Sequence, residues 1–170
     1  NLYGMSLGAE VKWLSPKRHN PLIQENGIIP PGYFWCEYLE GPHVSVDYHK
    51  RPNGRWEPYH AMLGVIEDDN LRKFKSWERI EAPYECEKLP VWIPRNVRDL
   101  NVEWRGDNII EVHLRTGNDP MHGSPVGEKL IPIFRGDDVP DGEFVSNEQE
   151  TDYDASGHIK EVREGYIRRR

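Results

Sequence analysis

The sequence is poor in cysteine and lacks the common phosphate-binding and nucleophile loops. Cys36 and Cys86 have no metal-ligand spacing, which favours a reduced, cytoplasmic chain and leaves one disulfide as the alternative. The 15 glycines are scattered, and neither the Walker-type nor the dinucleotide fingerprint occurs. No Gly-x-Ser-x-Gly elbow is present, and no pair of histidines has the spacing of a helical zinc site. Each of these absences removes a familiar class of enzyme.

Long hydrophobic runs and dense positive charge are also missing. No apolar run is long enough to cross a membrane, and the chain does not start like a signal peptide. The net charge of −7 disfavours nucleic acid, since the only dense basic cluster is at residues 168–170. We therefore expect neither a membrane nor a nucleic-acid partner. The chain begins with Asn rather than Met, and we expect it to be part of a longer protein.

Aromatic residues are plentiful, with 6 Trp, 8 Tyr and 4 Phe in 170 residues. This content is typical of a folded domain with a core. Short alternating runs separated by turn residues predict an α+β fold, mainly antiparallel β-sheet with few short helices. We expect a loop-rich segment at 1–32, a main domain at 33–135 and an extended C-terminal arm at 136–170. Within them the patterns predict strands over 56–66 and 130–134 and a helix over 69–77.

One informative stretch covers residues 33–47, where two strand-like runs flank Gly41-Pro42. The second run alternates, with Val44 and Val46 on one face and Ser45 and Asp47 on the other. A period of two predicts a strand with one buried face.

A second stretch, residues 100–116, reads as a hairpin that turns at Gly106-Asp107-Asn108. Its alternation predicts one buried face, made by Val102, Trp104, Ile110, Val112 and Leu114. The opposite, open face would then carry Glu103, Glu111, His113 and Arg115. Two carboxylates held close on adjacent strands repel each other unless a cation lies between them, and a hard divalent ion such as Mg²⁺ is the usual partner.

Together the two stretches resemble the carboxy-terminal half of the ATP-grasp nucleotide-binding fold, over about residues 33–118. The resemblance implies that Glu37, Leu39 and His43 hold the nucleoside of ATP. It also implies that Glu103, Glu111 and His113 hold Mg²⁺ or Mn²⁺, and that Arg115 faces the transferred phosphoryl group. His113 stands where the family has Asn, and imidazole suits Mn²⁺ or Zn²⁺ better than Mg²⁺.

What the resemblance implies is an ATP-dependent carboxylate–amine or carboxylate–thiol ligase that works through an acyl phosphate. Its partners would be the nucleotide and a small carboxylate. The Gly-rich lid of the family is missing. Lys12 or Lys17 is the candidate counterpart of its phosphate-contacting lysine, but each could also be an ordinary solvent-exposed lysine. We therefore expect only part of a catalytic unit, completed by an N-terminal half or a partner chain.

Two alternatives stay open. Glu103 and Glu111 could be ordinary solvent-facing acids paired with Arg105 and Arg115 across the hairpin. The whole chain could instead be a structural or assembly protein, for example of a virus-encoded particle, whose arm is ordered by a neighbouring subunit.

Overall fold

The structure is a computed structural model that describes residues 39–67, 70–82, 89, 93–117, 122–153 and 158–169. These residues belong to a compact unit, Leu39–Arg170. The strands in chain order are β1 (His43–Lys50), β2 (Trp56–Glu67), β3 (Asn70–Ile80), β4 (Asp99–Arg105), β5 (Asn108–His113), β6 (Lys129–Phe134), β7 (Glu143–Tyr153) and β8 (Ile159–Arg169).

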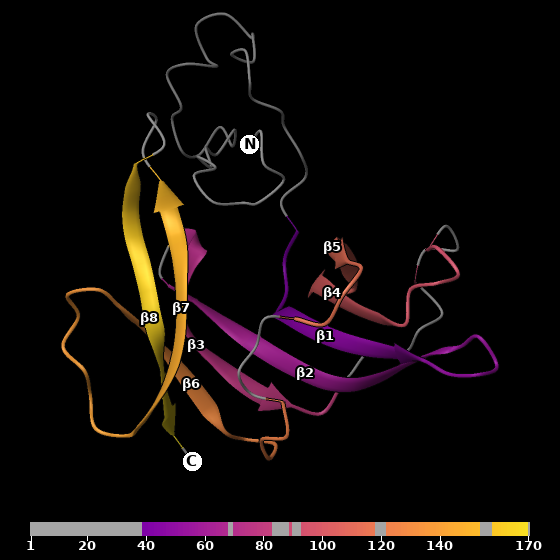
Figure 1. The fold of residues 1–170 in the computed structure, drawn as a ribbon, viewed down its shortest axis with the longest axis horizontal. Coiled ribbons are helices and arrows are strands. Elements are labelled where there is room, and N and C mark those ends of the chain that lie inside the picture. The colour runs from indigo at the N-terminus through magenta and orange to yellow at the C-terminus, as the bar shows by residue number, and fades with distance from the viewer. Residues whose placement is uncertain are drawn as a thin grey trace, which may run out of the picture. The chain divides into compact units, whose positions relative to one another are not determined.

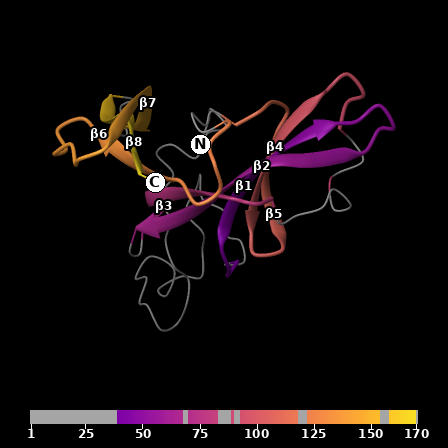
Figure 2. The ribbon, with the colours of Figure 1, turned by 90° about the horizontal axis from the view of Figure 1, so that it is seen from below.

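All of these strands form one eight-stranded sheet in the order β5-β4-β1-β2-β3-β6-β8-β7 (Figures 1 and 2). Each pair of neighbours is antiparallel. The mainly antiparallel β architecture expected from the sequence is therefore confirmed. β5 and β7 are the two edge strands.

Tight turns at glycine explain two of the hairpins. Gly54, with φ of 85°, closes the turn between β1 and β2, as the Asn53-Gly54 pair indicates. Gly106, with φ of 55°, closes the turn between β4 and β5, and its N–H donates to the carbonyl of Pro42 over 2.9 Å. A Cβ atom on Gly41 would lie only 2.7 Å from the Cα of Gly106. Glycine at both positions thus lets the start of β1 lie against this turn.

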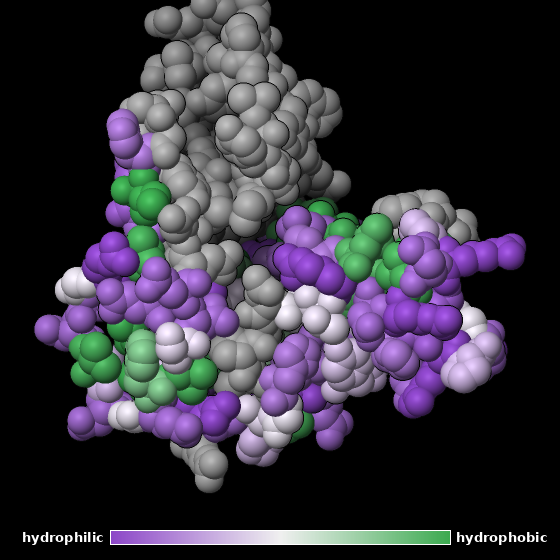
Figure 3. All heavy atoms as spheres, in the orientation of Figure 1, coloured by the Kyte–Doolittle hydropathy of each residue, from purple (hydrophilic) through white to green (hydrophobic). Residues whose placement is uncertain are grey.

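The main hydrophobic core lies on one face of β1, β2 and β4. The register of β1 and β4 pairs core residues directly: Val44 with Trp104, Val46 with Val102, and Tyr48 with Leu100. Each of these six side chains is at most 2% exposed. Because successive side chains of a strand point to opposite faces, the residues between them occupy the other face of the sheet. Hydrophilic side chains cover much of the visible surface of the described part, and exposed hydrophobic ones interrupt it (Figure 3).

The helix expected over 69–77 is wrong, because β3 runs through it from Asn70 to Ile80. Asp69 itself lies outside the described residues. β3 pairs with β2 over its length and with β6 near Trp77 and Glu78. No helix occurs among the residues that the structure describes. Pairing on both sides overrides a weak local preference for helix.

The buried face predicted for the 100–116 hairpin is partly wrong. Val102 and Trp104 are fully buried, but Ile110 is 44% exposed and Leu114 is 49% exposed. A bulge in β5 pairs Glu103 with Glu111 but Trp104 with Ile109, and Ile109 packs against the core instead of Ile110. One extra residue in a strand reverses the side-chain alternation beyond it.

The strands expected over 56–66 and 130–134 are confirmed as β2 and β6. Residues 136–170, expected to form an arm, contain β7 and β8, which join the sheet through the pairing of β8 with β6. Among the described residues, no helix is long and apolar enough to cross a membrane.

Candidate functional site

The face of the sheet opposite the core carries a continuous row of polar side chains, which we call the polar face. Its residues are His43, Ser45 and Asp47 of β1, His60 of β2, Asn101 and Glu103 of β4, and Glu111 and His113 of β5. The strand registers align them, pairing Ser45 with Glu103 and Asp47 with both Asn101 and His60. Several are nonetheless inaccessible: Asp47, His60, Asn101 and His43 are each no more than 8% exposed. Buried polar groups at this density require partners or ligands.

Glu103, Glu111 and His113 form the first cluster on this face, as the sequence analysis expected. The antiparallel register places Glu111 directly opposite Glu103. His113 Nε2 lies 3.5 Å from Glu111 Oε1 and 3.8 Å from Glu103 Oε1. One ligand atom from each residue lies within 4.8 Å of the others. Two carboxylates and one imidazole at these separations can hold a divalent cation.

His43 joins this cluster from the neighbouring strand. Its Nε2 lies 3.1 Å from Glu103 Oε2, a hydrogen-bond distance. Its ring packs edge-on against Phe74, with ring centroids 4.9 Å apart, and against Trp77, with centroids 5.8 Å apart. The resemblance implied that His43 contacts a nucleoside; the structure places its imidazole beside Glu103, the carboxylate expected to hold the metal.

The electrostatics of the cluster keep Glu103 ionised. Burial by itself would raise the pKa of Glu103, but contacts with His113 and His43 outweigh burial and lower the pKa to about 2. Glu103 in turn raises the pKa of His113, whereas burial and the charge of Arg115 act to lower it. The cluster therefore holds a negative charge on Glu103 next to the imidazole of His113, whose cationic form that charge favours.

The other expected site residues are distributed differently. The guanidinium of Arg115 donates to the carbonyl of Thr116 over 2.8 Å, just beyond the end of β5. Leu39 contributes a backbone carbonyl that accepts from Arg105 Nε over 3.2 Å. Glu37 lies outside the described residues. Of the expected residues, the structure thus brings together Glu103, Glu111, His113 and His43.

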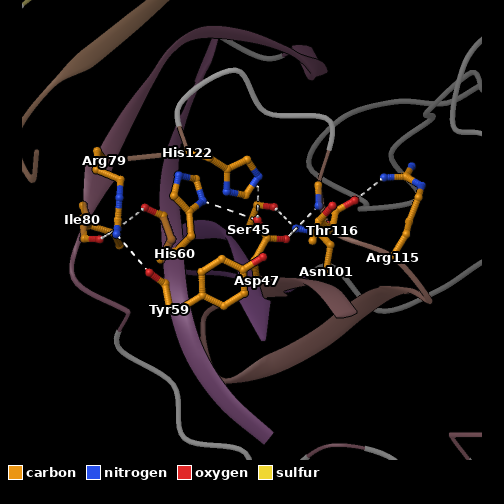
Figure 4. A network of polar contacts seen from close by, with 12 residues as sticks. Ser45, Asp47, Tyr59, His60, Arg79, Ile80, Asn101, Arg115, Thr116 and His122 are labelled. Atoms are coloured by element: carbon orange, nitrogen blue, oxygen red, sulfur yellow. Dashed lines mark hydrogen bonds and ion pairs between the residues drawn. The ribbon is translucent and has the colours of Figure 1, made fainter. Parts of the chain in front are cut away.

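A second cluster was missed by the sequence analysis: Asp47, His60 and His122, on β1, β2 and the segment before β6 (Figure 4). Asp47 Oδ2 lies 3.5 Å from His60 Nδ1 and 3.5 Å from His122 Nε2. Burial opposes ionisation of Asp47, but contacts with His60, the Gly117 N–H and Asn101 outweigh it and lower the pKa of the carboxyl. The alternation of Ser45 and Asp47 placed Asp47 on the polar face, but nothing local connected it to residues 60 and 122.

The chain was compared with known proteins in three ways. No protein-family model matches it, and searches of curated proteins and of solved structures found no significant match.

The donor set of the first cluster fits a divalent cation. Carboxylate oxygens dominate it, as Mg²⁺ and Mn²⁺ prefer, and the imidazoles shift the preference toward Mn²⁺. Such an ion bound between Glu103 and Glu111 would neutralise their repulsion.

Proposed function

We propose that this domain binds ATP together with a divalent cation and acts as the nucleotide-binding part of an ATP-grasp-type carboxylate–amine or carboxylate–thiol ligase. The observation that carries the proposal is the direct opposition of Glu103 and Glu111 on neighbouring antiparallel strands. This is the arrangement that the resemblance of residues 33–118 implies for the cation site of such enzymes.

The surroundings of the two acids support a nucleotide site. β1 lies next to β4 and begins at His43, directly after the Gly41-Pro42 corner. The imidazole of His43 is fixed by Glu103 on one side and by the rings of Phe74 and Trp77 on the other. The nucleoside contact inferred for His43 and the cation contacts inferred for Glu103 and Glu111 therefore come from the neighbouring strands β1, β4 and β5.

The chemical roles follow from charge. ATP supplies the phosphoryl group that activates a carboxylate as an acyl phosphate, and an amine or thiol then displaces phosphate. Glu103, Glu111 and His113 would hold the cation that neutralises the phosphates. Arg115 lies close enough to His113 for its charge to act on the pKa of that imidazole. In the proposed reaction Arg115 would leave its contact with Thr116 and bind the transferring phosphoryl group. No protein group needs to react covalently, so the contribution of these residues is positioning and charge neutralisation.

Calorimetric titration with ATP tests the proposal, in Mn²⁺, in Mg²⁺ and in excess chelator. We expect weak binding that requires the cation and that Glu111→Gln abolishes. Glu143→Gln is the matched control, because it makes the same change on the other edge strand, β7, where Glu143 is 62% exposed. Binding that ignores the chelator, or that both variants weaken equally, would contradict the carboxylate–cation model. Absence of binding combined with obligate self-association would favour the assembly protein.

A further inference from the structure

The carboxylate of Asp47 is held in a fixed orientation inside the sheet. Its Oδ1 accepts hydrogen bonds from the Gly117 N–H over 2.8 Å and from Asn101 Nδ2 over 3.0 Å. Asn101 Nδ2 also lies 2.8 Å from Ser45 Oγ. These bonds occupy one oxygen and direct the other, Oδ2, toward His60 and His122 (Figure 4). The Asp47 side chain is 2% exposed.

We propose that Asp47 Oδ2, His60 Nδ1 and His122 Nε2 form a binding site for Zn²⁺ or a similar divalent transition-metal ion, with a fourth coordination position left open. Two imidazoles and one carboxylate are a common donor set for such ions. The inference concerns a site other than the Glu103 cluster and does not depend on nucleotide binding.

The distances suit metal ligation better than hydrogen bonding. Both histidine nitrogens lie 3.5 Å from Asp47 Oδ2, beyond the usual range for an N–H···O hydrogen bond. Ligands about 2.1 Å from a tetrahedral zinc ion lie about 3.4 Å from one another. The imidazole rings of His60 and His122 are 4.5 Å apart between centroids and tilted by 34°, and both therefore reach the same carboxylate oxygen from different elements.

The charge of the site also favours a cation. The Asp47 carboxylate is buried, and its ion-pairing contacts are with two histidines, which are neutral when they ligate a metal. A buried carboxylate is costly without a compensating charge. A divalent ion would supply that charge, and the Oδ1 bonds from Asn101 and Gly117 would support the ligating carboxylate as outer-shell partners do.

The two histidines differ in accessibility. His60 is 3% exposed, and its Nε2 has no hydrogen-bond partner among the described residues. No neighbour at Nε2 therefore fixes its tautomer, and a lone pair on Nδ1 can face Asp47 Oδ2 when a cation lies between them. The His122 side chain is 39% exposed, so the ion would be reached from the His122 side and the open position would face solvent.

The test uses the full chain, stripped of metal and titrated with Co²⁺ and then Zn²⁺ without nucleotide. We expect Co²⁺ to give the visible absorption of a tetrahedral site and Zn²⁺ to displace it. His122→Gln should weaken Zn²⁺ binding at least about tenfold and remove the tetrahedral spectrum. His122 is chosen because it is exposed in a turn, where substitution leaves the sheet intact.

Two variants complete the design. His49→Gln is the matched control, since His49 is exposed and pairs with Asp99 over 2.8 Å outside the cluster; it should leave Zn²⁺ binding unchanged. Glu111→Gln reports on the Glu103 cluster and should leave the tetrahedral Co²⁺ spectrum of the Asp47 site unchanged. Two results would overturn the proposal. The first is Zn²⁺ binding that is weakened by Glu111→Gln but not by His122→Gln, and the second is a native chain that binds neither Co²⁺ nor Zn²⁺. Failure of ATP to bind would not affect this outcome.

Discussion

His43 Nε2 and Glu103 Oε2 lie 3.1 Å apart although the two residues are 60 positions apart in the sequence. The contact ties β1 to β4 on the polar face and links two side chains for which the sequence suggested different ligands. It also helps to keep Glu103 charged, because the contacts with His43 and His113 lower the pKa of that carboxyl.

Glu111→Gln is expected to preserve the fold and slightly raise the melting temperature of the metal-free protein. Directly opposed like charges on paired strands cost up to roughly 1 kcal/mol, and the variant removes one of them. Mn²⁺ or Mg²⁺ should raise the melting temperature of the native chain only. Differential scanning calorimetry with and without chelator measures both effects. If the variant is destabilised, and if the cation changes the melting temperature of neither the variant nor the native chain, Glu111 is an ordinary structural ion-pair partner.

Stability should depend on pH through Glu103 and His113. The pKa of Glu103 is lowered from 4.5 to about 2, so its contribution is complete above pH 4.5 and is lost as the pH falls toward 2. The pKa of His113 is raised from 6.5, so its contribution is complete below pH 6.5 and is lost as the pH rises through its folded pKa. This cluster should therefore raise the free energy of unfolding of the metal-free protein most between about pH 4.5 and 6.5.

The size of the Glu103 effect is at most about 3.5 kcal/mol, since its pKa falls from 4.5 to about 2 and one pKa unit corresponds to about 1.4 kcal/mol. Urea unfolding at several pH values, in chelator, should show that Glu103→Gln flattens the dependence and Glu143→Gln does not. Equal slopes in the native chain and in Glu103→Gln would mean that Glu103 does not titrate with this shift.

Leu100→Ala and Leu114→Ala form a matched pair that tests the two faces near the hairpin. Leu100 is fully buried against Tyr48 and its neighbours, whereas Leu114 is 49% exposed. Removing a buried leucine side chain costs about 2–5 kcal/mol, and an exposed position usually changes stability by less than about 0.5 kcal/mol. Chemical denaturation gives both values, and a comparable loss at Leu114 would show that its side chain packs against the core.

Gly64→Ala is expected to destabilise the protein by about 1–3 kcal/mol. An added Cβ would lie 2.6 Å from Cε1 of Phe74 and 2.9 Å from Cζ3 of Trp77. Those rings would have to move, and the ring of His43 packs on both of them. The variant should therefore also weaken cation-dependent ATP binding. Val65→Ala, at a neighbouring residue that is 42% exposed, is the control; equal stability of the two variants would show that the rings shift without cost.

Local sequence patterns determined β1, β2, β6, the β4–β5 hairpin and the Asn53-Gly54 and Gly106 turns; the opposition of Glu103 and Glu111 also depends on the bulge in β5. The reason is that a hairpin's register follows from its turn and its alternation, both of which lie within a few neighbouring residues. The same patterns correctly placed Val44 and Val46 on the core face and Ser45 and Asp47 on the other.

Only the tertiary structure decided the remaining features. Residues 70–80 form β3 because β2 and β6 pair with them on either side. A bulge in β5 places Ile109 against the core in place of Ile110. His43 met Glu103, and Asp47 met His60 and His122, through strand pairings between residues far apart in the sequence. No local period encodes such pairings, because they depend on which strands become neighbours and in which register when the whole sheet forms.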